Sequence, residues 1–167
     1  MRNRSIQLVV MLLVFNFYAG AAAFGFSMST LQNLPGVGVS VKQLSPDAER
    51  LGVSGDALEL LMESRLKSGA ITVFPNDRVS DIPGAPLLEL TVLVRKVEGE
   101  SSYLFTARLA LQEMVVMERP TQHLASIYAA TWEKTILGIT HQKGYVDGAV
   151  GQLIARFIRE FKEENVE

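Results

Sequence analysis

Two histidines are the side chains of this sequence best suited to bind a metal ion or to act as a base near neutral pH. His123 and His141 lie 18 residues apart, in segments without a regular hydropathy pattern. A metal site on a helix places a second histidine or a carboxylate three or four residues from the first. Neither histidine has such a neighbour. The sequence therefore predicts no metal site.

Nucleophilic catalysis and phosphate binding also lack a signature. The G-x-S-x-G turn that exposes a nucleophilic serine is absent from the chain. The glycine-containing segments 35–39 (PGVGV) and 52–55 (GVSG) match neither the dinucleotide-binding pattern nor the phosphate-binding loop of nucleotide hydrolases. We therefore predict no catalytic residue and no cofactor.

A proline-rich segment is the remaining place where polar chemistry could be organised. Residues 75–86 (PNDRVSDIPGAP) contain three prolines and a glycine, which predicts an irregular loop. Its charged side chains are Asp77, Arg78 and Asp81. A small hydrolase with its site near this loop, using Glu113 or His123, is the alternative hypothesis. Charged loop residues are usually only solvated, so we do not make it the main one.

The elements that would position these groups follow from the hydropathy pattern. Alternating valines predict a strand over residues 37–44. Apolar residues spaced by three and four predict a helix over residues 55–68, with Ser54 as its N-cap and Gly69 at its end. A second apolar stripe, from residue 146 to residue 161, predicts a C-terminal helix that packs against a sheet.

Four further segments have the pattern of strands. They are residues 71–74, 87–95, 103–117 and 126–137, of which the second and third are joined by a polar turn and predict an antiparallel hairpin. In the last segment, simple alternation places Tyr128, Trp132 and Ile136 on one face. Trp132 is expected to pack in the core rather than to stack on a ligand.

These elements define a fold class. Their order is β-α-β-β-β-β-α, which predicts an α+β two-layer sandwich with a mixed five-stranded sheet and both helices on one face. We expect a single domain over residues 36–167. The preceding residues 24–35 show neither period and are expected to be a flexible linker.

The sheet face opposite the helices is the predicted binding surface. Alternation along the two hairpin strands places both apolar and basic residues on it, and the partner-binding candidates are Leu93, Arg95, Arg108, Met114 and Val116. Scattered exposed apolar residues are also ordinary on protein surfaces. The same alternation points Glu113 into the core, which is costly for an unpaired carboxylate. A β-bulge near residues 112–114 would relieve this conflict, the other reading being a functional buried Glu113.

The first 23 residues have the three-part layout of a secretory signal peptide. Arg2 and Arg4 precede an apolar run of about 13 residues, and small residues follow, with Ala21 and Ala23 before a cleavage site at Phe24. A membrane-spanning helix needs about 20 apolar residues. The alternative is an uncleaved inner-membrane anchor over residues 6–23. We expect a periplasmic or secreted protein without an integral membrane span after cleavage.

Composition narrows the classes of partner. Without Arg2 and Arg4, 14 basic residues face 18 acidic ones, a net charge of −4 that is unfavourable for nucleic-acid binding. The chain has no cysteine, which excludes disulfide bonds, thiolate chemistry and the acylated N-terminal cysteine of a lipoprotein. A protein or a cell-envelope component is the expected partner, and the oligomeric state is left open.

The layout as a whole resembles that of small exported bacterial proteins of uncharacterised function. A leader, a Val-rich strand and a helix ending in the 65–73 segment (RLKSGAITV) are followed by the 83–86 loop (PGAP), a long hairpin, the 130–132 triplet (ATW) and an amphipathic helix. This order is similar to that of the anticodon-binding-like α/β modules of envelope proteins, such as the N-terminal domain of TolB, curli-secretion lipoproteins and LptE-type lipoproteins. The resemblance implies an envelope role and no particular functional residue.

Overall fold

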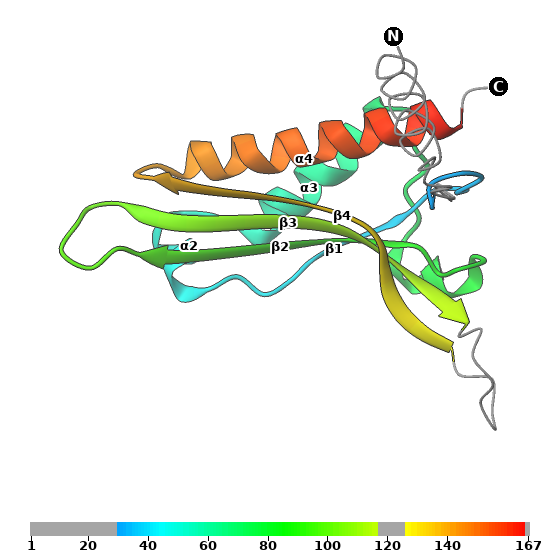
Figure 1. The fold of residues 1–167 in the computed structure, drawn as a ribbon, viewed down its shortest axis with the longest axis horizontal. Helices are drawn as coiled ribbons and strands as arrows, with labels where there is room; N and C mark the ends of the chain where they lie inside the picture. The colour runs from blue at the N-terminus through cyan, green and yellow to red at the C-terminus, as the bar shows by residue number, and fades with distance from the viewer. Residues whose placement is uncertain (1–29, 117–125, 166–167) are drawn as a thin grey trace, which may run out of the picture.

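The structure is a computed structural model that describes residues 30–116 and 126–165. Its elements are, in order, β1 (Gly38–Val41), α2 (Pro46–Arg50), α3 (Gly55–Ser68), the 3-10 helix η1 (Asn76–Asp81), β2 (Leu87–Lys96), β3 (Tyr103–Val116), β4 (Ser126–Thr140) and α4 (Lys143–Glu164). The α+β class is as predicted, with α3 and α4 on one side of a single sheet (Figure 1). No helix in these two ranges is long and apolar enough to cross a membrane.

The sheet has four strands in the order β1-β2-β3-β4. β1 runs parallel to β2, and the connection between them contains α2, α3 and η1. β2, β3 and β4 form an antiparallel meander. The edge strands are therefore β1, with four residues, and β4, with 15 residues.

The predicted five-stranded sheet is wrong because residues 71–74 do not form a strand. They make a single parallel bridge, between Val37 and Val73. Two backbone hydrogen bonds, each 2.9 Å long, join the segment to Val37. Pro75 follows immediately and has no N–H with which to continue a ladder. The β-branched pattern was real, but the segment is too short to add a fifth strand.

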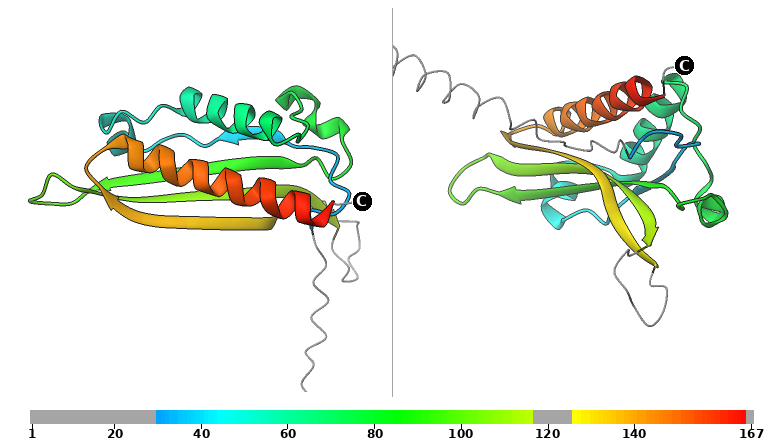
Figure 2. Two further views of the ribbon diagram at one scale, coloured as in Figure 1. Left: turned by 90° about the horizontal axis from the view of Figure 1, so that it is seen from above. Right: turned by 45° about the vertical axis from the view of Figure 1, so that its right-hand side comes forward.

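The core lies between the sheet and the two long helices. α3 has the predicted bounds: the Ser54 side chain accepts a hydrogen bond from Ala57 N, and Gly69 follows the last residue. The buried side chains of α3 are Leu58, Met62 and Leu66. The predicted stripe of α4 is also confirmed, with Val146, Val150, Leu153, Ile154 and Phe157 buried and with Ile158 and Phe161 packed against the core. Seen from above, both helices lie over the same face of the sheet (Figure 2).

Trp132 packs against the core, as predicted. Its ring meets that of the fully buried Phe157 edge to face, with 5.0 Å between ring centroids and 73° between ring planes. Its indole N–H donates a hydrogen bond of 2.7 Å to a carboxylate oxygen of Glu160. The polar end of the tryptophan is thereby satisfied without water or a ligand.

The folded domain begins before Gly36, the predicted boundary. Leu31 and Leu34 are 3% and 8% exposed and belong to the core. The Asn165 side chain, at the end of α4, donates to the backbone carbonyl of Leu31 over 2.8 Å. The linker predicted for residues 24–35 is therefore corrected over its described part, residues 30–35. Residues 24–29 and the predicted signal peptide lie outside the described residues.

Side chains near α2 satisfy the part of β2 that extends past β1. The Ser45 hydroxyl donates to Val94 O over 2.9 Å and accepts from Val94 N over 3.2 Å. Farther along, the Asp47 carboxylate accepts a hydrogen bond of 3.1 Å from Lys96 N. That hydrogen bond, together with the neighbouring Arg50, lowers the pKa of Asp47. The free edge of β2 is thus occupied by side chains of the same molecule.

A β-bulge interrupts the pairing of β3 with β4 near the predicted position. Leu111 pairs with Trp132 and Gln112 pairs with Ala130, so the extra residue is Thr131, in β4 rather than in β3. The Thr131 hydroxyl donates to the half-buried Glu113 carboxylate. Glu113 is therefore partnered at the end of the sheet and is not an unpaired acid in the core.

The same bulge corrects the predicted face of β4. Trp132 and Ile136 point toward the helices and pack against the core. Tyr128 pairs with Met114 and lies on the opposite face. One extra residue between positions 128 and 132 reverses the alternation, because side chains change face at every residue of a strand.

Candidate functional site

The candidate site is the sheet face that α3 and α4 leave uncovered, here called the open face. Pairing aligns the residues of β2, β3 and β4 in rows across this face. At the end nearest the β2–β3 hairpin, Thr106 lies between Leu93 and Leu137, and Leu104 pairs with Ile139. The rows divide the open face into an apolar band, a charged band and a second apolar cluster.

The apolar band consists of four exposed aliphatic side chains from three strands. Their exposed fractions are 57% for Leu93, 43% for Leu104, 66% for Leu137 and 67% for Ile139. Beside the band lies a shallow depression of about 290 Å³, lined by Ser45, Leu93, Val94, Arg95, Leu104 and Thr106. Adjacent exposed aliphatic side chains next to a hollow favour the binding of apolar groups, because binding removes apolar surface from water.

The charged band crosses the middle of the sheet. Lys42 Nζ lies 3.1 Å from a Glu89 carboxylate oxygen, and Arg108 Nε donates to Glu133 over 3.0 Å. The Glu89 oxygen is buried and has no well-oriented hydrogen bond, so Lys42 compensates it by charge alone. These ion pairs join neighbouring strands and separate the apolar band from the far end of the sheet.

The second apolar cluster lies where β3 and β4 continue past the start of β2. Met114, Val116 and Tyr128 are there, with exposed fractions of 46%, 61% and 53%. β2 begins opposite Gln112, so this end is a two-stranded ribbon, and it bends away from α4 (Figure 1). It presents apolar side chains at the margin of the molecule.

The five sequence-predicted residues all lie on the open face, but they do not form one patch. Leu93 and Arg95 belong to the apolar band or border it, Arg108 lies in the charged band, and Met114 and Val116 lie beyond it. Sequence reasoning missed three members of the apolar band: Leu104, Leu137 and Ile139. Alternation in the predicted strands 103–117 and 126–137 indicates the face of Leu104 and Leu137, whereas Ile139 lies beyond the predicted end of the last strand. The proximity of all three depends on the pairing register.

The predicted 75–86 loop contains η1, which covers one corner of the open face. Val79 is buried against β1, where a Cβ on Gly38 would lie 2.3 Å from a Val79 methyl group. A depression of about 330 Å³ next to it is lined by Ser40, Asn76, Val79, Ser80, Leu87 and Tyr128. Asp77, Arg78 and Asp81, the charged residues of the loop, are exposed.

One backbone hydrogen bond bears on the alternative hypothesis of a hydrolase site near the 75–86 loop. Met114 N donates to Gly84 O over 2.7 Å, which brings the end of the loop next to Glu113. The Glu113 carboxylate, however, is bound by the Thr131 hydroxyl, on a residue whose place is fixed by the bulge. His123, the other residue of that hypothesis, lies outside the described residues. The bulge in β4 therefore accounts for the position of Thr131 beside Glu113, and this contact is not evidence of catalysis.

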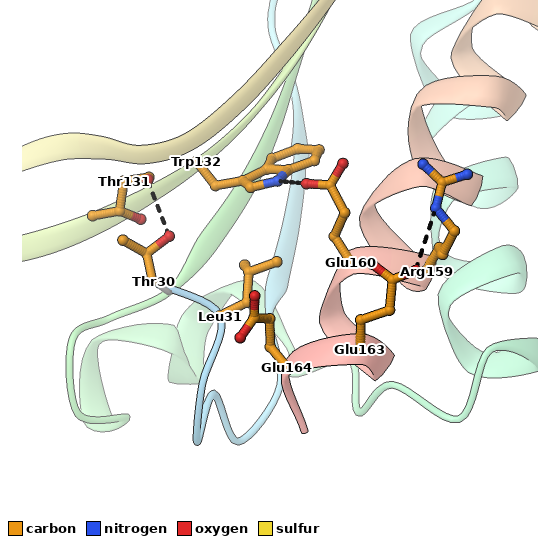
Figure 3. A pocket seen from close by; sticks show the side chains of 8 residues that line it. All are labelled: Thr30, Leu31, Thr131, Trp132, Arg159, Glu160, Glu163 and Glu164. Atoms are coloured by element: carbon orange, nitrogen blue, oxygen red, sulfur yellow. Dashed lines mark hydrogen bonds and ion pairs between the residues drawn. The ribbon is translucent and has the colours of Figure 1, made fainter. Parts of the chain in front are cut away.

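A groove of about 450 Å³ lies between the N-terminal segment, β4 and the end of α4 (Figure 3). Its polar side chains, Glu164 apart, contact neighbouring residues. Trp132 Nε1 donates to Glu160, Lys134 Nζ lies 3.4 Å from the second oxygen of that carboxylate, and the Thr30 hydroxyl donates to Thr131 O over 3.0 Å. The groove therefore joins three segments of the fold and is a weaker candidate than the open face.

Metal binding and similarity to known proteins add no further candidate. Within residues 30–116 and 126–165, no three His, Cys, Asp or Glu side chains converge on a point where they could hold an ion. No protein-family model matches the sequence, and neither does any curated protein.

Proposed function

We propose that the chain is an exported, non-enzymatic binding or scaffold module of the bacterial cell envelope, and that its open face binds a protein or an envelope component. The apolar band is the observation that carries this proposal. Four adjacent aliphatic side chains that are 43–67% exposed gain free energy whenever a partner removes them from water.

The arrangement around the band supports recognition of a protein surface. Arg95 borders the band, and the depression of about 290 Å³ beside Leu93 and Leu104 offers space for apolar side chains of a partner. An apolar centre with a charged rim is the usual anatomy of protein interfaces, and arginine is enriched there. The ion pairs of the charged band would then orient the partner rather than supply most of the affinity.

The proposed compartment rests on the first 23 residues. Two arginines, an apolar run and a small-residue segment favour export and cleavage, which places the domain in the periplasm or outside the cell. Retention of residues 6–23 as an inner-membrane anchor leaves the domain on the same side of the membrane. The open face meets envelope components in both cases.

Photocrosslinking in the producing cells tests the binding role. A photoreactive amino acid that replaces Leu93 in the full-length chain should give an adduct of one defined mass. The same amino acid at Leu60, which is 68% exposed on α3, is the matched control and should give none. Equal labelling at both positions, or none at Leu93, would refute the role of the open face.

A further inference from the structure

The two edges of the sheet are protected to very different degrees. At the β1 edge, the strand is only four residues long, Val37 is bridged to Val73, and Ser45 and Asp47 bind the free backbone of β2. An unprotected edge strand offers unpaired N–H and C=O groups to any other strand, and these devices prevent such pairing. The β1 edge is therefore closed.

The first half of β4 is protected as well. Thr131 forms the bulge, and its carbonyl accepts a hydrogen bond from Thr30. Glu133 is paired with Arg108, and Lys134 lies beside Glu160. Bulges and charges are both features that discourage pairing at an edge.

The second half of β4 has none of these features. Residues 135–140 (TILGIT) contain no charge and no proline, and they pair with β3 without irregularity. The β-branched residues Thr and Ile, which favour strands, make up four of the six positions. α4 crosses the sheet obliquely and leaves the outer side of this part of β4 uncovered (Figure 2).

We propose that a second copy of this chain pairs with residues 134–140 along this edge, in antiparallel orientation. A two-fold axis normal to the sheet makes the interface self-complementary. It also keeps both open faces on the same side, so residues that pair across the axis must share a face. The result is a continuous eight-stranded sheet in which both β4 strands lose their free edge.

The side chains select the register of this pairing. With Leu137 opposite Leu137 of the second copy, Thr135 lies opposite Ile139 and Lys134 lies opposite Thr140, so the pairing stays within β4. The pair on the axis is aliphatic, and no two like charges lie opposite each other along the paired strands. A shift of two residues in one direction brings Glu133 against Ile139. A shift in the other direction shortens the pairing that β4 can supply from seven residues to five, because the strand ends at Thr140.

The dimer also joins the two apolar bands. Leu137 and Ile139 lie at the outer edge of the band, so pairing of the edges makes the two bands contiguous across the axis. A doubled apolar surface would bind a two-fold symmetric or repetitive partner more tightly than one copy does. The pairing itself does not depend on what the open face binds.

Disulfide crosslinking of the full-length chain in its producing cells tests the pairing. The chain has no cysteine, so a single introduced cysteine reports only on its own position. L137C should form a disulfide-linked dimer on mild oxidation, since residues opposite each other across antiparallel strands have the required spacing. Ile139, equally exposed on the same face of the same strand, is the matched control. In the proposed pairing its two copies are about four residues apart along the strand direction.

Comparison of crosslinking at different positions tests whether two copies pair through β4. Crosslinking of L137C that exceeds that of I139C and of L60C by about tenfold or more is expected, from the distance that a disulfide requires. Equal crosslinking of L137C and I139C, or none in L137C, would overturn the proposal. Crosslinking of L93C as strong as that of L137C would also overturn it, because Leu93 lies two strands from the edge and meets its copy only if open faces stack.

A variant without cysteine gives an independent check on solution mass. L137K places two ammonium groups opposite each other on the axis, which disfavours the pair. Sedimentation equilibrium of the unsubstituted chain should show a mass that rises toward twice that of one chain with increasing concentration, and L137K should keep the single-chain mass. A chain that stays monomeric at every concentration contradicts the pairing and leaves the photocrosslinking result at Leu93 unaffected.

Discussion

Asp47 is the residue whose ionisation is tied most directly to the fold. Its carboxylate accepts a hydrogen bond from Lys96 N and contacts Arg50, and both interactions lower its pKa below the ordinary value of 3.8. A lowered folded-state pKa means that the ionised form stabilises the fold above that value. The contribution is lost as the pH falls through the folded-state pKa.

Replacement of Asp47 by Asn should therefore destabilise the domain at neutral pH and have a shrinking effect in acid. The amide keeps an acceptor oxygen but not the charge, so it mimics the protonated acid. Urea titrations of both proteins between pH 7 and pH 2 measure the difference in free energy of unfolding. A difference that stays constant below pH 3.8 would show that the charge has no role.

Ser45→Ala provides the control for that titration. Its hydroxyl caps α2 and also binds Val94 of β2, and it does not ionise in this range. Loss of the Ser45 hydroxyl should lower the free energy of unfolding by about 1 kcal/mol, as is typical for an N-cap. The decrease should be the same at every pH at which the domain is folded. A strongly pH-dependent cost for Ser45→Ala would point to a general effect of acid on this edge.

Among the elements, α4 is held against the sheet mainly through Phe157. Its side chain is fully buried and packs edge to face against Trp132. Phe157→Ala should lower the free energy of unfolding by about 3–5 kcal/mol, since it removes a large buried ring and leaves a cavity. Denaturant titration measures this, with Phe161→Ala, which is only partly buried, as the milder comparison. A loss below about 1 kcal/mol would mean that α4 is not packed as described.

Elements that are determined by neighbouring residues of the sequence could be predicted. Features that depend on how strands pair with one another could not. The bounds of helix 55–68 agree with the prediction, because the apolar spacing within it and the capping residues Ser54 and Gly69 at its two ends are all local signals. The bulge was expected near residues 112–114 from the position of Glu113. Its location in β4 depends on the partner strand, and the predicted face of Tyr128 was wrong for that reason.

Pairing also explains the other differences. Residues 71–74 have the composition of a strand, but only Val37 is available to pair with them before Pro75. The predicted α+β class is nevertheless correct, because it depends on the two apolar helix stripes and not on the number of strands. Leu104, Leu137 and Ile139 join Leu93 through the register of three strands, which the sequence of any one strand does not contain.

Export is the prediction that concerns the whole chain. The leader predicts that the protein in the cell begins at Phe24 and is found outside the inner membrane. N-terminal sequencing of protein from separated cell fractions measures both properties. A cytoplasmic product that still begins with Met1 would contradict export, and a membrane-bound product that retains the leader would favour the anchor.

We expect the open face of the whole molecule to bind a partner. Leu93→Lys and Met114→Lys place a charge on exposed positions of that face, and Leu60→Lys places the same charge on α3. Such surface changes should alter the free energy of unfolding by no more than about 0.5 kcal/mol. A charge buried in an apolar interface, in contrast, costs about 2 kcal/mol or more of binding free energy.

The most direct measurement combines stability and capture on the same four proteins. The immobilised full-length chain and its three variants are exposed to one extract of the producing cells' envelope, and the captured partner is quantified alongside the free energies of unfolding. We expect full stability in all four proteins, with capture reduced at least about tenfold by Leu93→Lys and unchanged by Leu60→Lys. Stable Leu93→Lys and Met114→Lys proteins that capture as much partner as the unsubstituted chain would contradict this expectation.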